Sequence, residues 1–81
     1  MYIHLGGEKL IRTSQVVAIF DISIEQTSKL SRQFVASAQN NRKVESIGEE
    51  AAKSIVVTED KVYYSPISAT TLKKRAKYLD S

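Results

Sequence analysis

Residues that could carry out catalysis are few and poorly spaced in this chain of 81 residues. An enzyme needs a nucleophile with a base, a working pair of carboxylates or a metal site. The single histidine, His4, falls in an alternating stretch typical of a strand, so we expect a structural or solvent-facing role for it. Glu49 and Glu50 are neighbours in a predicted loop, which favours a solvated acidic turn. The sequence therefore predicts no catalytic residues and no enzyme.

Phosphate-loop and metal chemistry are not indicated either. The segment Gly6-Gly7-Glu8-Lys9 superficially resembles a phosphate-binding loop. It lacks the G-x-x-x-x-G-K-[ST] spacing that wraps backbone amides around a phosphate, and a hairpin turn is favoured. Without cysteine and with one histidine, the chain is a poor candidate for a zinc site. We expect no metal, no cofactor and no small-molecule substrate.

The basic residues offer binding chemistry instead. Twelve Lys and Arg against nine Asp and Glu give a net charge of +3, so position matters more than the sum. Several basic residues crowd the predicted C-terminal helix, where they could neutralise phosphates or merely complement the helix dipole. The candidates for nucleic-acid binding are Lys29, Arg32, Arg42, Lys43, Lys53, Lys73, Lys74, Arg75 and Lys77.

Sequence-specific reading of bases is not visible in the residues. The chain has neither a helix-turn-helix signature nor a ribonucleoprotein motif. Tyr63 and Tyr64 could stack on bases, but neighbouring residues of a strand face opposite ways. We therefore expect at least one of the two tyrosines in the core.

The stretch that organises the fold is a β-hairpin near the C-terminus. β-branched and aromatic residues predict strands at 55–58 and 62–64, joined by a polar turn at 59–61. Pro66 ends the second strand because it has no amide proton to give to a ladder.

A helix is expected directly after this hairpin. It opens at about Ala69, and the Ser68 side chain can accept a hydrogen bond from one of the free amides of the first turn. One face of this helix carries Leu72, Ala76 and Leu79, and the basic residues surround the rest.

Strands are also predicted in the N-terminal part. Residues 2–5 alternate, Gly6-Gly7 forms a turn that permits positive φ, and residues 9–12 return. Residues 16–20 form an unbroken apolar run, which predicts a strand buried on both faces. So small a domain can cover one sheet face with its own helices, and we expect a second subunit to cover the other.

A helix follows from about Ser23 or Thr27 to Asn40, and Asn40-Asn41 is a plausible stop because asparagine tolerates the left-handed conformation. Its apolar stripe should face the sheet, and this stripe consists of Leu30, Phe34, Val35 and Ala38. Lys29 and Arg32 lie on the outer face.

A short edge strand at 44–47 and a loop at 48–52 lead into the C-terminal hairpin. The expected fold is α+β: a small mixed sheet of about five strands with two helices, in the order strand, strand, helix, short strand, hairpin, helix.

Length and composition set outer limits on these expectations. A single core is marginal at this size, and the chain lacks cysteine for disulfides, so oligomerisation is the remaining route to stability. No apolar run approaches the length of a membrane span, and the start lacks the apolar core of a signal peptide. We expect a cytoplasmic protein without membrane contact.

The motifs KSIVVT, YYSP and TTLKKRA, together with the opening MYIHLG, occur in an order that resembles the RemA/RemB family of bacterial extracellular matrix regulatory proteins, its B branch in particular. The resemblance implies one RemA/RemB-like domain over residues 1–81 and a fold of the LytTR type. It also implies a homo-oligomeric ring that regulates biofilm matrix genes. Duplex DNA and a RemA-like sibling regulator are the partners it suggests.

One departure from the family bears on DNA binding. RemA carries a paired arginine after the glycine that corresponds to Gly48, within a basic loop credited with DNA contact, whereas this chain has Glu49-Glu50. Lys53 alone keeps a positive charge close to where RemA has another arginine. The first hypothesis is a ring that binds DNA; the alternative is a ring that docks another regulator without contacting DNA.

Overall fold

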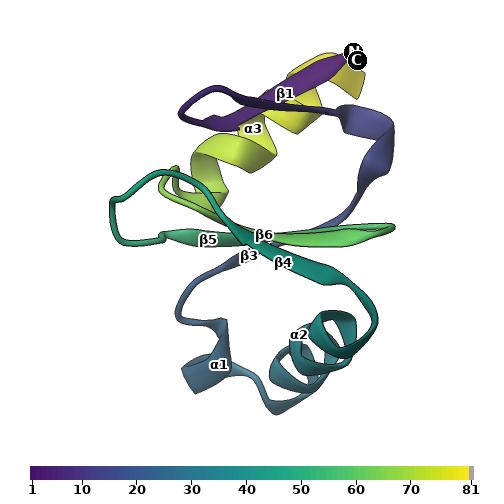
Figure 1. Ribbon diagram of the computed structural model, residues 1–81, viewed down its shortest axis with the longest axis vertical. Coiled ribbons are helices and arrows are strands. Elements are labelled where there is room, and N and C mark those ends of the chain that lie inside the picture. The colour runs from purple at the N-terminus through teal and green to yellow at the C-terminus, as the bar shows by residue number, and fades with distance from the viewer. Residues whose placement is uncertain (81) are drawn as a thin grey trace.

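A four-stranded sheet forms the middle layer of the protein (Figure 1). The computed structural model describes residues 1–80, and the side chains of all of them except 25, 27 and 77–80. The strands lie in the order β3 (Val16–Asp21), β5 (Ser54–Thr58), β6 (Lys61–Ser65) and β4 (Lys43–Ser46). Neighbouring strands are antiparallel except β4 and β6, which are parallel.

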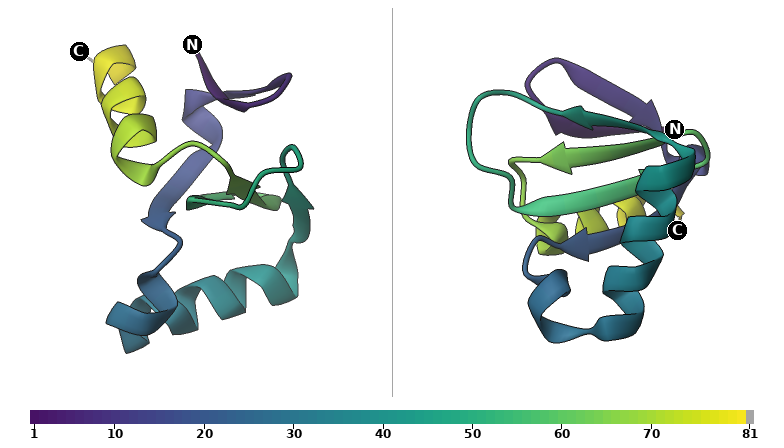
Figure 2. Two further views of the ribbon diagram at one scale, coloured as in Figure 1. Left: turned by 90° about the vertical axis from the view of Figure 1, so that its left-hand side faces the viewer. Right: turned by 60° about the horizontal axis from the view of Figure 1, so that its bottom comes forward.

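Both faces of this sheet are covered by the chain itself. A hairpin of β1 (Tyr2–Gly6) and β2 (Lys9–Arg12) lies on one side with α3 (Ala69–Asp80), as Figure 1 shows. The single turn α1 (Ile24–Thr27) and the longer α2 (Lys29–Asn41) lie on the other side (Figure 2). A 3₁₀ turn, Thr13–Gln15, connects the hairpin to β3.

Two separate apolar cores result from this layering. The core on the hairpin side consists of Ile3, Leu5, Ile11, Ile47, Val56, Tyr63 and Leu72. The core on the α2 side consists of Val35, Ala38, Ile55, Val57 and Val62. The expectation that a second subunit must cover one sheet face is therefore wrong, because the N-terminal hairpin covers that face within the same chain.

The C-terminal hairpin confirms its local sequence signals. β6 ends at Ser65, directly before Pro66. The hydroxyl of Thr58 accepts a hydrogen bond from the Lys61 amide at 3.0 Å and holds the turn. Ser68 caps α3 by accepting from the Thr71 amide at 3.2 Å.

Tyr63 and Tyr64 lie on opposite faces of β6, as their adjacency predicts. The ring of Tyr63 is buried in the hairpin-side core, and that of Tyr64 packs against the α2-side core. The Tyr63 ring is therefore the one in the core, and Tyr64 is half-buried.

The apolar run in β3 is not buried on both faces, contrary to expectation. β3 is an edge strand, and the Val17 side chain, at a register shift between Val16 and Ala18, is 52% exposed. Two-sided burial occurs in its neighbour β5 instead, where all five residues are buried. A continuous run of apolar residues therefore does not tell whether a strand lies at the edge or in the centre of the sheet.

The apolar stripe of α2 also faces the sheet only in part. Val35 and Ala38 are buried, whereas Leu30 is 79% exposed and Phe34 43% exposed. The reason is that the helix packs its C-terminal half on β5 and β6, and its N-terminal half extends beside the edge strand β3. The helix ends at Asn41 without a left-handed residue, since Arg42 is extended (φ −136°).

The class of fold is α+β as predicted, with two corrections of detail. Residues 9–12 form a strand of their own, which brings the number of strands to six, and the strands make two sheets rather than one. Gly6 and Gly7 have positive φ, as their turn requires. The resemblance to LytTR domains stays a prediction.

Candidate nucleic-acid interface

Lys53 and Lys73 lie at one end of the four-stranded sheet, and both are exposed. The Lys53 carbonyl accepts a hydrogen bond from the Ile22 amide at 3.1 Å, which places Lys53 beside the end of β3. Lys73 is close enough to Asp21, the last residue of β3, to act on its carboxylate. This end of the sheet is also where the loop of residues 48–52 emerges.

The carboxylate of Asp21 is held chiefly by Ser23. The backbone N–H of Ser23 donates to Asp21 Oδ1 at 2.9 Å and its hydroxyl donates at 2.7 Å. These two hydrogen bonds, with a smaller contribution from the charge of Lys73, lower the pKa of Asp21 below its ordinary value. Asp21 is therefore a negative charge set among the basic candidates at this end.

Arg42 and Lys43 lie at the opposite end of the sheet. Arg42 Nε donates to the Thr58 carbonyl at 2.7 Å, and the Lys43 amide donates to the Asp60 carbonyl at 3.3 Å. Both residues line a shallow polar depression together with the acidic pair Glu59 and Asp60. The acids partly offset the positive charge that these two residues would offer to a phosphate.

Lys74 and Arg75 face the N-terminal hairpin. Arg75 Nη1 donates to the His4 carbonyl at 2.9 Å, so the guanidinium fastens α3 to β1. His4 is exposed on β1, and its Nε2 lies 2.7 Å from the Gly7 carbonyl oxygen within the hairpin. The side chain of Lys77 is outside the set of side chains that the structure describes.

Lys29 and Arg32 are exposed on α2, on the far side of the sheet from α3. The candidates therefore occupy four separate regions of one subunit: α2, the two ends of the sheet and the hairpin-facing side of α3. Lys53 and Lys73 lie at the same end of the sheet, although they are distant in the sequence.

The loop after β4 presents the acidic pair to solvent. Ile47 anchors its start, with a buried side chain and an amide that donates to the Tyr64 carbonyl at 2.9 Å. Gly48 turns the backbone with φ +71°. Glu49 and Glu50 are both exposed, as a solvated acidic turn requires.

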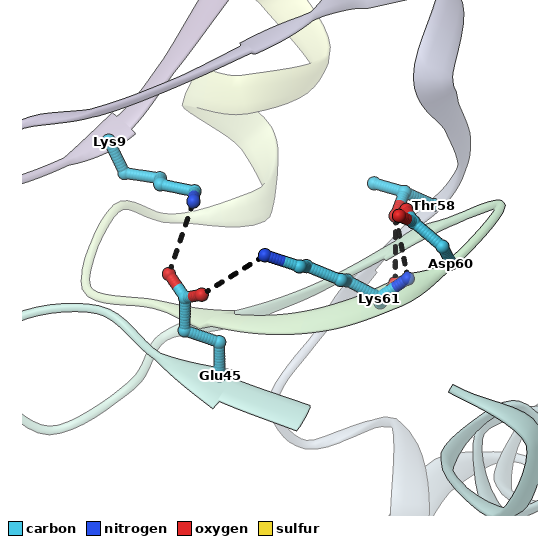
Figure 3. Close-up of polar contacts among 5 residues, drawn as sticks. All are labelled: Lys9, Glu45, Thr58, Asp60 and Lys61. Atoms are coloured by element: carbon cyan, nitrogen blue, oxygen red, sulfur yellow. Dashed lines mark hydrogen bonds and ion pairs between the residues drawn. The ribbon is translucent and has the colours of Figure 1, made fainter. Parts of the chain in front are cut away.

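A cluster of charges that was not predicted links the hairpin to the sheet (Figure 3). The Glu45 carboxylate lies between two ammonium groups, 3.4 Å from Lys9 Nζ and 3.6 Å from Lys61 Nζ. Both ammonium groups also lie over the Tyr63 ring, at 5.2 Å and 5.9 Å from its centroid. No local pattern could have revealed it, because its members come from β2, β4 and β6.

The pKa of Lys9 reflects this environment. Partial desolvation opposes the charged form, but the Tyr63 hydroxyl and the Glu45 carboxylate outweigh it and raise the pKa above its ordinary value. Lys9 and Lys61 thus neutralise Glu45 and are less available to a phosphate than the freely exposed lysines.

The described part of the chain contains no helix long and apolar enough to span a membrane. Among those same residues, no three His, Asp or Glu side chains come together as they would to hold a metal ion.

Comparison with known proteins relates nearly the whole chain to matrix regulators. The family model described as "RemA-like: Extracellular matrix regulatory protein A-like" matches residues 2–76. A protein of Bacillus subtilis (strain 168) named "Extracellular matrix regulatory protein B" is 42% identical over 79 residues, which cover 98% of this chain and 94% of that protein.

Proposed function

The chain belongs to the RemA-like family of extracellular matrix regulatory proteins, and on this premise we propose that it regulates extracellular matrix genes as a homo-oligomeric ring that binds duplex DNA. The observation that carries the proposal is the similarity to a named matrix regulator over almost the full length of both chains.

The distribution of charge explains why DNA binding would need an assembly. Lys53 and Lys73 are exposed at one end of the sheet, and Lys29 and Arg32 are exposed together on α2. Two phosphate contacts at any one of these places give weak binding. An assembly that repeats such a pair around a ring presents many contacts to one polyanion. The affinity then grows with subunit number through effective concentration.

The acidic pair favours a second candidate function. Glu49 and Glu50 emerge at the same end of the sheet as Lys53 and Lys73, and their charge opposes the approach of phosphates there. A ring that docks another regulator, a sibling of the same family for example, would use this mixed surface without contacting DNA.

The electrophoretic mobility of duplex DNA at low salt separates the two candidates. We expect weak retardation by the natural chain and a clear gain for the Glu49→Arg, Glu50→Arg double variant, because each subunit then changes by four charge units at the loop. The matched control is the triple variant Glu8→Arg, Ser14→Arg and Gln26→Arg, which makes the same change of net charge at exposed positions away from the loop.

Three other outcomes have definite meanings. Equal gains for the double variant and its control would mean that net charge alone governs binding and that the loop has no special place. Tight binding by the natural chain with no gain for the double variant would mean that the loop does not face the DNA. No binding by any of the three proteins would replace the DNA proposal with the docking of another regulator.

A further inference from the structure

An uncharged apolar surface lies between α2 and the edge strand β3, and it is called the α2 surface below. It is lined by Val17, Ala18, Phe20, Leu30, Ser31 and Phe34. The rings of Phe20 and Phe34 pack at 5.8 Å between centroids, and Leu30 projects beside them with 79% of its surface exposed. Adjacent exposed aliphatic and aromatic side chains of this kind mark an interaction site.

A second apolar surface lies where the N-terminal hairpin meets α3, and it is called the hairpin surface. It is lined by Tyr2, Ile3, His4, Leu10, Thr71, Lys74 and Arg75. Tyr2 is 57% exposed and Leu10 is 59% exposed, both on the side of the hairpin away from the core. The hairpin surface thus differs from the α2 surface in having two cations at its rim.

The two surfaces are on opposite sides of the four-stranded sheet. Figure 2 shows the hairpin and α3 above the sheet and α2 below it in the left-hand view. One subunit therefore cannot cover either surface with the other, and a second copy could cover each. Two different surfaces on one chain are what a head-to-tail contact between identical subunits requires.

We propose that the hairpin surface of one copy binds the α2 surface of the next. Pairing two hairpin surfaces would bring Lys74 and Arg75 against their own copies, at an electrostatic cost. The α2 surface has no cation among its lining residues, and the exposed face of Phe34 can accept a cation over its ring. A single head-to-tail contact covers both apolar surfaces, whereas pairing two α2 surfaces leaves Tyr2 and Leu10 in water.

This contact rests on the proposed homo-oligomer and gives it two specific faces. Repetition of a head-to-tail contact closes into a ring if the rotation between neighbours allows it. Lys74 and Arg75 would then lie between subunits, and Lys73, which is exposed on α3 and does not line the hairpin surface, would stay free for phosphate.

Two substitutions and their mixture test the inference. Leu30→Glu disables the α2 surface and Leu10→Glu disables the hairpin surface, and both positions are exposed enough that the subunit keeps its fold, which circular dichroism checks. By light scattering at high micromolar concentration, we expect several subunits per particle for the natural chain and one for each variant. An equal mixture of the variants should form a particle of two subunits, because each variant retains the surface that the other has lost.

The control is Ala36→Glu, an exposed position on the opposite side of α2, which should keep the natural mass. The inference is overturned if Leu10→Glu or Leu30→Glu keeps the natural mass, or if the mixture stays monomeric. A natural chain that is itself monomeric would overturn the proposed homo-oligomer as well. A multimeric natural chain that tolerates both substitutions would overturn only the assignment of these surfaces.

Discussion

The central strand β5 and the edge strand β3 are both rich in apolar residues, but their surroundings differ. β5 has five buried residues between two layers of its own chain. β3 carries an equally apolar sequence, yet its burial is mostly partial and Val17 is exposed. The comparison shows that the apolar residues of a strand set how much surface it can bury. The position of the strand in the sheet decides how much of that surface is covered by its own chain.

The largest expected contrast is between the same substitution in the two strands. Val56→Ala in β5 removes buried methyl groups and leaves a cavity, at a cost of about 2–3 kcal/mol in the free energy of unfolding. Val17→Ala in β3 should change it by less than about 0.5 kcal/mol, because the side chain is half in water.

Chemical denaturation measures both values, and both variants are best made in the Leu30→Glu background so that association does not contribute. Equal losses would mean that β3 is as well covered as β5 and would remove the contrast.

The buried hydroxyl of Ser65 in β6 extends the comparison between central and edge strands to polar groups. Ser65 Oγ donates to the Leu5 carbonyl at 2.6 Å and accepts from the Ile67 amide at 3.1 Å, so it joins the sheet to both flanking segments. Ser65→Ala leaves two backbone groups without this partner and should cost about 1–3 kcal/mol.

The matching change on the edge strand β4, Ser46→Ala, alters an exposed serine and should be nearly neutral. Denaturation midpoints compare the two, and a neutral Ser65→Ala would mean that water replaces the hydroxyl.

A smaller effect is expected at the ion pairs of β4. Glu45→Gln removes the carboxylate from between Lys9 and Lys61, and partly exposed pairs of this kind contribute about 0.2–1 kcal/mol. Because folding raises the pKa of Lys9, its contribution is present below the ordinary value of 10.5 and is lost as pH rises through the raised value.

Stability measured from neutral to strongly alkaline pH should therefore decline less steeply in Glu45→Gln. Glu8→Gln, at an exposed position in the hairpin turn, is the control, and an identical alkaline decline in both variants would contradict the assignment.

The smallest effect is expected at the end of β3. The pKa of Asp21 is lowered by its hydrogen bonds from Ser23, so its contribution is present above the ordinary value of 3.8 and is lost as pH falls through the lowered value. Carboxyl chemical shifts in a titration should place the pKa of Asp21 below its ordinary value of 3.8. Ser23→Ala, which removes the hydroxyl donor, should raise that pKa, and an unchanged titration would rule out the hydroxyl as a cause.

Local signals predicted the local parts of the fold. The end of β6 before Pro66, the Ser68 cap and the turn at Gly6-Gly7 depend on a few neighbouring residues, and each was predictable because the backbone leaves few alternatives. The exposure of Leu30 was not predictable, since the helical period specifies a stripe but not how far the underlying sheet extends along it.

The candidate site was less predictable than the fold. The position of Lys73 depends on how α3 packs, and the cluster around Glu45 depends on strand order and on how the N-terminal hairpin packs on the sheet. No spacing in the sequence encodes either arrangement. The division of the basic residues among four regions follows from the same cause. What the sequence did indicate was the charge reversal after Gly48, because it concerns adjacent residues of an exposed loop.

The parallel pairing of β4 with β6 limits which changes the loop after β4 can accept without disturbing the fold. Ile47 and Lys53 hydrogen-bond to Tyr64 and Ser65 from opposite sides of β6, so residues 48–52 must pass around the end of an intervening strand. That path spans two strand spacings, about 10 Å, and a deletion would pull one strand out of register. Insertions and changes of charge meet no such limit. The loop can therefore exchange its acidic pair for a basic one while the fold stays intact.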